Sequence, residues 1–333
     1  MSQKYRVAIA GAGTIGCFVG GALLAAGHEV AMLARPRVVD EIGRHGLRIT
    51  DCDGYDCVID TSRLRLSDDP AVLADADYVL LTVKSADTAG MAGLIAHDAA
   101  PAAVIVSLQN GIGNLPLLRQ QLVGRSVLGG MVPYNVMPMG AGRYHRATSG
   151  HILIERDAAA TAAQLSTPHL IMQPTDDIAG VQHGKLLLNL NNALNALSGL
   201  TLREQLASRA WRGLFADLLT EGLAAMTGEG LKPVSTTAIP VRMLPWLLRL
   251  PDAVFNPLLG RLMKIDPAAR SSMFEDLERH RRTEIDYLQG AVLDMARRQR
   301  TDARLTQRIV MLIKDAERAG NGSPRLTPEQ IRA

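Results

Sequence analysis

The chain has 333 residues, of which 47% are hydrophobic and 21% are charged. This balance is typical of a globular protein and argues against disorder, and the length suggests two domains. The formal net charge of +3 is a weak excess of basic residues spread along the chain, so no nucleic-acid partner is expected.

The three cysteines, Cys17, Cys52 and Cys57, are odd in number and show no Cys-x-x-Cys spacing. We therefore expect neither a disulfide framework nor a bound metal, but reduced thiols in a cytoplasmic protein. The N-terminus shows no signal-peptide pattern, and no apolar run approaches the ~18 residues that span a bilayer. No membrane partner is expected.

Short apolar runs alternate with amphipathic ones in the first half of the chain. Strands are predicted over residues 5–10, 29–34, 78–83, 103–108, 126–131 and 151–155, with a polar hairpin over 46–50 and 54–59. Such strands, separated by helices, predict a parallel sheet covered on both faces. Helical patterns then follow at about 180–198, 203–228, 241–263, 270–298 and 302–318.

A glycine-rich motif follows the first predicted strand and opens a helix. It consists of Gly11, Ala12, Gly13, Thr14, Ile15 and Gly16 and fits G-x-G-x-x-G. The glycines permit a tight turn and close backbone approach, and the helix N-terminus offers N–H groups to a pyrophosphate. The motif predicts a dinucleotide cofactor.

The residues after the second predicted strand indicate which dinucleotide is bound. Leu33 is followed by Ala34-Arg35-Pro36-Arg37, with no acid to bond the ribose 2′-hydroxyl of NAD. The planar guanidinium of Arg35 can instead pair with a 2′-phosphate, although a solvated surface arginine is the alternative. NADPH is therefore predicted over NADH.

Two further polar residues follow predicted strands. Lys84 comes after the strand over 78–83, and Asn110 comes after the strand over 103–108. Ligands of open α/β sheets lie outside these strand ends, so both residues are expected near the nicotinamide end of the cofactor. A loop lysine and a simple Asn-Gly turn are the alternatives.

One leucine-rich helical stretch, residues 184–198, contains a lysine and four asparagines. Asparagine is a poor choice inside a helix, and burying four amides without partners would cost about 1–3 kcal/mol each. On a straight helix Lys185, Asn189 and Asn192 share one face, which suits a small polar substrate. Amides that cap loops or cross a helix interface are the alternative.

An acidic cluster follows between residues 270 and 288. Ser272, Asp276 and Glu284 are expected on one helical line, at successive offsets of four and eight residues. A solvated acidic face would explain these residues alone. A lysine in a dry cleft, however, needs a nearby acid to keep it charged, so the presence of Lys185 favours a functional role for this cluster.

The predicted fold is α/β, with an N-terminal Rossmann-type parallel sheet and a C-terminal all-helical domain. We expect an NADP-binding Rossmann domain over residues 1–178, a helical substrate and catalytic domain over 179–320, and a flexible tail over 321–333, because the chain from Gly320 is rich in Gly, Ser and Pro. The apolar helices near 241–263 fit either a cleft wall or a dimer surface, so a monomer and a homodimer both remain open.

With these motifs, the chain resembles the ketopantoate reductases (2-dehydropantoate 2-reductases) from about residue 5 to about residue 318. The similarity is carried by the glycine loop, Val83-Lys84, Gln109-Asn110-Gly111, Lys185 with Asn189, and the segment from Ser272 to Asp286. The segment Thr283-Glu284-Ile285-Asp286-Tyr287 is the most specific of these.

The resemblance implies a role for each matched residue. Lys185 corresponds to the catalytic lysine and Glu284 to its partner acid, while Asn110, Asn189 and Ser272 contact substrate and Lys84 lies near the active site. Arg35 matches the arginine that favours the extra phosphate. The family places a second substrate asparagine eight residues after the lysine, where this chain has Ala193, so Asn191, Asn192 and Asn195 stay open.

The sequence thus predicts an NADP-dependent oxidoreductase that reduces a 2-oxo acid. Lys185 would stabilise the charge on the carbonyl oxygen and donate the proton. The expected reaction is reduction of 2-dehydropantoate (ketopantoate) to pantoate in pantothenate and coenzyme A biosynthesis. The long segment at 239–266 keeps open another 2-oxo or 2-hydroxy acid, and a non-catalytic NADPH-binding sensor is the third reading.

Overall fold

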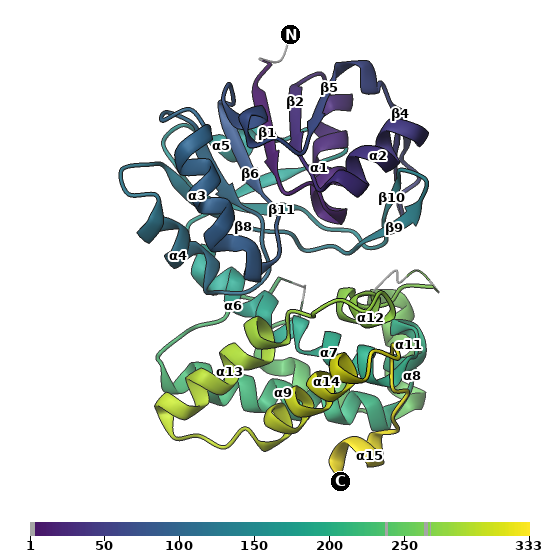
Figure 1. Ribbon diagram of the computed structural model, residues 1–333. Coiled ribbons are helices and arrows are strands. Elements are labelled where there is room, and N and C mark those ends of the chain that lie inside the picture. Colours follow the sequence, from purple (N-terminus) through teal and green to yellow (C-terminus); the bar gives the residue numbers. More distant parts are fainter. Residues whose placement is uncertain (1–3, 237–238, 263–265, 267) are drawn as a thin grey trace. The chain divides into compact units, whose positions relative to one another are not determined.

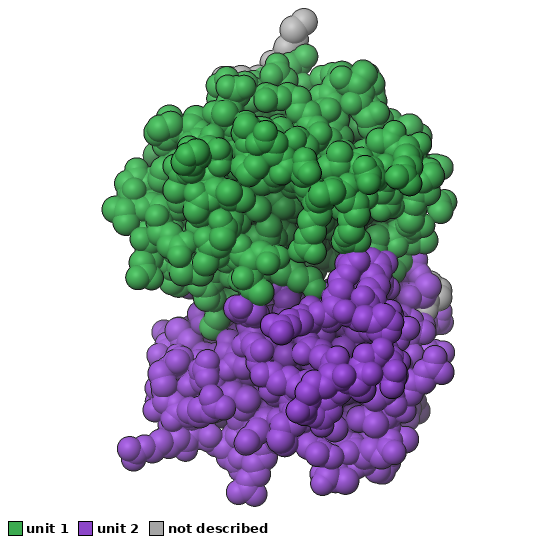
Figure 2. Space-filling view, viewed as in Figure 1, with its two compact units in different colours: residues 1–178 green, residues 179–333 purple. Residues whose placement is uncertain are grey.

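The computed structural model describes residues 4–236, 239–262, 266 and 268–333. The chain divides into two compact units, Met1–Ile178 and Ala179–Ala333, which Figure 2 colours separately. Each unit is described by itself below. Of the apolar segment singled out at 239–266, residues 263–265 lie outside the described residues.

The first unit is mixed α/β (Figure 1). Its strands are β1 Arg6–Ala10, β2 Glu29–Leu33, β3 Leu47–Asp51, β4 Asp56–Ile59, β5 Leu64–Ser67, β6 Tyr78–Leu81, β7 Val104–Ser107, β8 Val127–Met131, β9 Val136–Gly140, β10 Arg143–Arg146, β11 Ile152–Glu155 and β12 Met172–Thr175. Its helices are α1 Thr14–Ala25, α2 Pro36–His45, α3 Thr88–Asp98, α4 Asn114–Gln121 and α5 Thr161–Leu165, with short 3₁₀ turns η1 Thr61–Arg63, η2 Pro70–Leu73 and η3 Ser85–Asp87.

An eight-stranded sheet forms the centre of this unit, in the order β12-β11-β8-β7-β6-β1-β2-β5. The six strands from β8 to β5 are parallel, and β11 joins them antiparallel to β8. Strand β1 is therefore flanked by β6 and β2, so the loops after these three strands meet at one edge. The predicted Rossmann-type sheet is confirmed.

A second, four-stranded sheet has the order β4-β3-β10-β9. The expected hairpin is present as β3 and β4, and β3 also pairs in parallel with β10. Helix α1 contacts strands of both sheets, and every residue from Gly16 to Leu24 is buried. A helix that is apolar on all sides is expected where protein covers it completely.

The second unit is all-helical, as predicted. Its helices are α6 Ile178–Asn189, α7 Asn191–Ser198, α8 Leu202–Ala207, α9 Arg209–Gly228, α10 Leu244–Leu248, α11 Asp252–Leu262, α12 Ser272–Glu278, α13 Ile285–Gln299, α14 Arg304–Ala319 and α15 Pro328–Arg332, with a 3₁₀ turn η4 Val241–Met243. The first residue of α6, Ile178, is the last residue of the first unit. Helix α13 packs against α9 and α14, and α12 packs against α7.

The stretch expected as one helix near 241–263 contains several short helices among its described residues, and the fully buried Arg212 on α9 binds the ends of two of them. Its guanidinium donates to the carbonyls of Leu206, Ala207, Leu248 and Leu250 and pairs with Asp252 at 2.8 Å. One side chain thus satisfies carbonyls at the ends of α8 and α10 and a carboxylate at the start of α11. Helix ends need such partners when they are buried.

The expected flexible tail differs from the structure. Residues Pro328–Arg332 form α15, whose N-terminus carries a complete capping box between Thr327 and Gln330. Ile331 is fully buried. Local capping and one apolar anchor therefore order a segment whose Gly, Ser and Pro content suggested fraying.

Candidate active site

The glycine loop forms a tight turn at the end of β1. The N–H groups of Gly11 and Ala12 both donate to the carbonyl of Leu33, at 3.2 and 2.7 Å. Gly11 has φ +96°, and a Cβ there would collide with Val83 Cγ1 and lie 3.0 Å from Val83 N. The loop therefore packs directly against the chain that leaves β6, and only glycine fits.

The N-terminus of α1 is suited to an anion. Gly13 is its N-cap and supplies no side chain, and the first turn contains no acidic residue. Thr14 and Ile15 are partly buried and Gly16 is buried. The first N–H groups of a helix have no partner within it, and the helix dipole favours negative charge there. These residues fit the pyrophosphate of a dinucleotide.

Arg35 follows β2 and is the N-cap of α2. Its Nη2 atom lies 3.2 Å from Asp87 Oδ2, and both side chains are more than half exposed. Leu33, Ala34 and Arg35 offer no carboxylate at the end of β2. The residues present are compatible with a 2′-phosphate, and Asp87 is a neighbour that the sequence did not reveal.

A buried polar network links the loops that carry Lys84 and Asn110. The amide of Asn114 donates to the Asn110 carbonyl at 2.6 Å and to Ser85 Oγ at 3.1 Å, and Gln109 Nε2 donates to the Val83 carbonyl at 3.0 Å. Asn114 and Gln109 are both buried. Satisfied buried networks fix geometry, so the loops after β6 and β7 form one rigid edge.

Lys185 lies on α6 and is partly buried. Burial disfavours its charged form and lowers its pKa to about 8. Asn189, one helical turn further along, is buried. The preceding residue, Gly184, is in close contact with the backbone of Val234, and a Cβ at that position would overlap the Val234 carbonyl. The glycine thus allows the segment around Val234 to cover the helix beside the lysine.

The single helix expected over Lys185, Asn189 and Asn192 is divided into two helices at Leu190, whose own backbone stays helical (φ −59°, ψ −27°). Helix α6 ends at Asn189 and α7 begins at Asn191, with Leu190 between them. Gln289 Nε2, which is buried in α13, donates to the Leu190 carbonyl at 2.9 Å. Lys185 and Asn189 still share one helix face, whereas Asn192 belongs to the next helix.

Two of the four asparagines bind other parts of the same unit. Asn191 accepts from the Gln205 amide at 3.0 Å, and Asn195 Nδ2 donates to Gln205 Oε1 at 3.1 Å. Asn195 also accepts from the backbone N–H of Ser271 at 2.8 Å. Because these amides cross a helix interface, Asn192 is the remaining candidate for the second substrate amide; its side chain is partly exposed.

Ser272 and Glu284 do not lie on one helical line, so that expectation was wrong. Ser272 is the exposed first residue of α12, which ends at Glu278, and Glu284 is the N-cap of α13. Hydrogen bonds nevertheless connect the start of α12 and the second turn of α13 to the α6–α7 junction. Ser271 Oγ donates to the Asn192 carbonyl at 2.9 Å, and Gln289 reaches Leu190.

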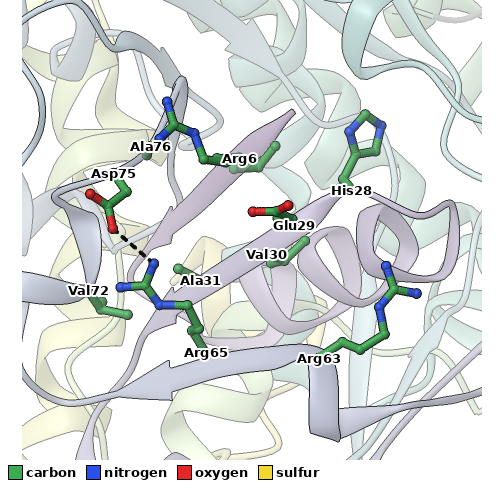
Figure 3. A pocket seen from close by; sticks show the side chains of 11 residues that line it. Arg6, His28, Glu29, Val30, Ala31, Arg63, Arg65, Val72, Asp75 and Ala76 are labelled. Carbon is green, nitrogen blue, oxygen red and sulfur yellow. Dashed lines mark hydrogen bonds and ion pairs between the residues drawn. The ribbon is translucent and has the colours of Figure 1, made fainter. Parts of the chain in front are cut away.

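A pocket of about 290 Å³ lies elsewhere in the first unit (Figure 3). Its lining includes Arg6 and Glu29, which are the first residues of β1 and β2. Figure 3 shows the guanidinium of Arg65 directed at Asp75, 3.3 Å away. The pocket is therefore at the opposite strand ends from the glycine loop, and it is not the predicted site.

Among the described residues, no group of three or more His, Cys, Asp or Glu side chains could hold a metal ion. No helix in that part of the chain has the length and apolar character needed to cross a membrane.

Known proteins match both units. The sequence profile "Ketopantoate reductase PanE/ApbA" matches residues 7–158, and its C-terminal counterpart matches residues 177–317. The 2-dehydropantoate 2-reductase of Halobacterium salinarum is 28% identical over 329 residues, which cover 95% of this chain and 100% of that protein.

Solved structures share the fold. A PanE/ApbA family ketopantoate reductase from Ralstonia eutropha has a TM-score of 0.79 at 29% identity, covering 95% of this chain and 99% of that one. D-mandelate dehydrogenase with NADH and anilino(oxo)acetate has a TM-score of 0.77 at 22% identity, with the same coverage of 95% and 99%. This chain belongs to the ketopantoate reductase family and is an NAD(P)-dependent oxidoreductase.

Proposed function

We propose that this enzyme reduces the carbonyl group of a 2-oxo acid with NADPH, and that the acid is 2-dehydropantoate, which becomes pantoate. Lys185 carries the proposal. Its pKa of about 8 is close to a working pH, and this is the property that makes a side chain an efficient general acid. Relatives that match nearly the whole chain are named 2-dehydropantoate 2-reductase, which supports this choice of substrate. The reaction would serve pantothenate and coenzyme A biosynthesis.

When bound, the nicotinamide supplies the hydride that forms the new C–H bond. Protonated Lys185 donates a hydrogen bond to the carbonyl oxygen of the substrate, stabilises the negative charge that develops on it, and then passes its proton to that oxygen. The oxo acid gains one hydride and one proton and becomes a hydroxy acid. Glu284 holds the ammonium group and accepts a hydrogen bond from a substrate hydroxyl.

Three further side chains of the second unit bind and orient the substrate. Asn189 and Asn192 come from the two sides of the α6–α7 junction, and Ser272 stands at the exposed start of α12. We assign these three side chains to the polar groups of the substrate, with Ser272 on its carboxylate. Fixed orientation of this kind contributes strongly to reactions between two bound groups.

The cofactor is held by the first unit. The glycine loop and the start of α1 bind the pyrophosphate, Arg35 pairs with the 2′-phosphate of NADPH, and Lys84 and Asn110 bind the nicotinamide end. The buried amide of Asn114 supports the last assignment, because it fixes the Asn110 carbonyl. Asn110 is also assigned to the substrate, which would lie against the nicotinamide.

The test is oxidation of NADPH by 2-dehydropantoate, measured beside pyruvate and an aromatic 2-oxo acid. We expect kcat/KM for 2-dehydropantoate to exceed the others by at least about tenfold, as pocket contacts commonly achieve. Lys185→Ala should lower turnover by at least about 10²-fold while NADPH still binds. Lys232→Ala, which removes an exposed lysine of the same unit, is the matched control. Near-normal turnover in Lys185→Ala would refute the mechanism.

A second candidate keeps the residues and changes the substrate to another 2-oxo acid, or to a 2-hydroxy acid oxidised in reverse. The segment at 239–262 favours it, because Met243 is 52% and Trp246 is 64% exposed there. The same substrate panel decides between the candidates. Tight NADPH binding without turnover on any 2-oxo acid would instead support a sensor.

A further inference from the structure

One ion pair bridges the two loops on either side of the glycine loop. The sheet order β6-β1-β2 places the end of β1 between its two neighbours. Arg35 follows β2 and Asp87 belongs to η3 after β6, yet their side chains meet at 3.2 Å. The Arg35–Asp87 pair therefore crosses the sheet edge at the position of β1, whose loop is the proposed pyrophosphate site.

Both ends of this pair have a fixed backbone. The Arg35 carbonyl accepts the N–H groups of Val38 and Val39 in the first turn of α2, at 2.8 and 3.2 Å. The Asp87 N–H donates to the Lys84 carbonyl at 2.9 Å. The two side chains are exposed, but backbone hydrogen bonds hold the residues that carry them in place.

Asp87 is the last residue of η3, which runs directly into α3, and its backbone is helical (φ −94°, ψ 0°). An aspartate caps the first turn of a helix from a non-helical backbone, so Asp87 is not placed to do so. Its side chain makes no cap bond and approaches Arg35. The carboxylate is thus directed at the guanidinium that the 2′-phosphate of NADPH requires.

We propose that Asp87 is a specificity-determining residue, which restrains the preference for NADPH by competing with the 2′-phosphate for Arg35. The inference rests on the proposed function, because it assumes a dinucleotide in the glycine loop. NADPH must displace or share the carboxylate and brings a further negative charge beside it. NADH has a neutral hydroxyl at that position and leaves the ion pair intact.

The competition predicts the direction in which nucleotide affinity changes when the charge of Asp87 is removed. Asp87→Asn keeps the size of the side chain and removes its charge. The affinity for NADPH should rise by at least about threefold, a change typical of one exposed charge interaction, and the affinity for NADH should stay within about twofold. The gain should shrink as added salt screens the charges.

The experiment measures the dissociation constants of both nucleotides by fluorescence titration of the full chain, at an ionic strength of about 0.15 M. Asp75→Asn is the matched control. Asp75 also pairs with an exposed arginine, Arg65, but at the opposite end of the same strands. A five-residue strand is about 16 Å long, or two screening lengths, so this control should leave both affinities unchanged.

A double variant tests whether the effect passes through Arg35. In an Arg35→Gln background, Asp87→Asn should change the ratio of the two affinities less than it does in wild type, because only the direct repulsion between Asp87 and the 2′-phosphate is left to remove. If Asp87→Asn leaves NADPH affinity unchanged or lowers it, while wild type binds both nucleotides, Asp87 does not compete and this inference alone is overturned. Failure of wild type to bind either nucleotide would overturn the proposed function.

Discussion

Gln289 Nε2 donates a hydrogen bond to the Leu190 carbonyl, 2.9 Å away, across 99 residues of sequence. The bond lies where α6 ends and α7 begins. The Leu190 N–H is shared between the carbonyls of Leu186 and Leu187, at 3.2 Å each, so the helical ladder is already irregular there. Gln289 thus provides a partner for a carbonyl at the helix junction between Asn189 and Asn192.

Gln289→Leu should destabilise the second unit and weaken substrate binding. A buried carbonyl that loses its donor costs about 1–3 kcal/mol, which a shift in the urea midpoint would report. We also expect KM for the 2-oxo acid to rise while the affinity for NADPH stays unchanged, because Asn189 and Asn192 flank the junction. Gln307→Leu, on an exposed site of α14, is the control. An unchanged unfolding midpoint would contradict the role given to this bond.

The pKa of Lys185 predicts the pH profile of the reaction. With a value of about 8, roughly 90% of the lysine is protonated at pH 7, and kcat/KM should fall tenfold per unit well above pH 8. Lys185→Arg should remove this alkaline limb, because arginine does not lose its proton, although the remaining activity would be low. A wild-type profile that stays level to pH 10 would be inconsistent with Lys185 as the acid.

The same shift predicts an effect on stability. The folded-state pKa lies below the value of about 10.4 in an unfolded chain, so the unfolded state binds more protons between pH 8 and that value. The contribution of Lys185 to stability therefore rises with pH across this window, and the protonated form opposes folding below it. Lys185→Met should raise the melting temperature at pH 7. A lower melting temperature in that variant would show that favourable contacts of the ammonium outweigh its desolvation.

Gly11→Ala should abolish tight nucleotide binding. A Cβ at Gly11 would collide with Val83 Cγ1, and its φ of +96° is strained for alanine. We expect at least about a tenfold loss of NADPH affinity and a lower melting temperature. Gly43→Ala on α2 is the control, since a Cβ there meets nothing within 4 Å. Alanine is also the better helix former, so the control should be neutral or stabilising.

Asn192 and Asn195 can be separated by kinetics and unfolding. Asn195→Ala removes bonds to Gln205 and to the Ser271 N–H, and should destabilise the fold by about 1–3 kcal/mol. Asn192→Ala should leave the unfolding midpoint unchanged and raise KM for the 2-oxo acid. The reverse pattern would assign the second substrate amide to Asn195.

Local signals explain most of what the sequence predicted correctly. The strand, glycine loop and helix at residues 6–25 follow from one contiguous pattern, and so does the hairpin of β3 and β4. The polar strand β10, Arg143–Arg146, has no apolar alternation and was missed. It forms a hairpin with the neighbouring β9, and it pairs on its other side with β3, about 95 residues earlier in the chain.

The helix interruptions could not be predicted, because their causes are distant. Leu190 is a good helix former, and the group that accompanies the break, Gln289, is far away in sequence. Likewise the amides of Asn191 and Asn195 form hydrogen bonds with Gln205, and the sequence spacing did not identify Gln205 as their partner. Residue types along the chain identified candidate polar groups. Tertiary contacts then decided which of these groups form hydrogen bonds within the fold.

Helix α1 is enclosed between two sheets, and its small residues make this possible. A Cβ at Gly21 would lie 3.1 Å from Ile49 Cγ2 of β3, so the second sheet fits closely against the helix. A helix confined on both sides has little freedom to tilt or unwind. The N–H groups of its first turn are therefore already oriented toward the pyrophosphate position before a ligand binds. Nucleotide capture at this end should therefore carry a small ordering entropy, and larger residues on the far face of α1 should weaken it from a distance.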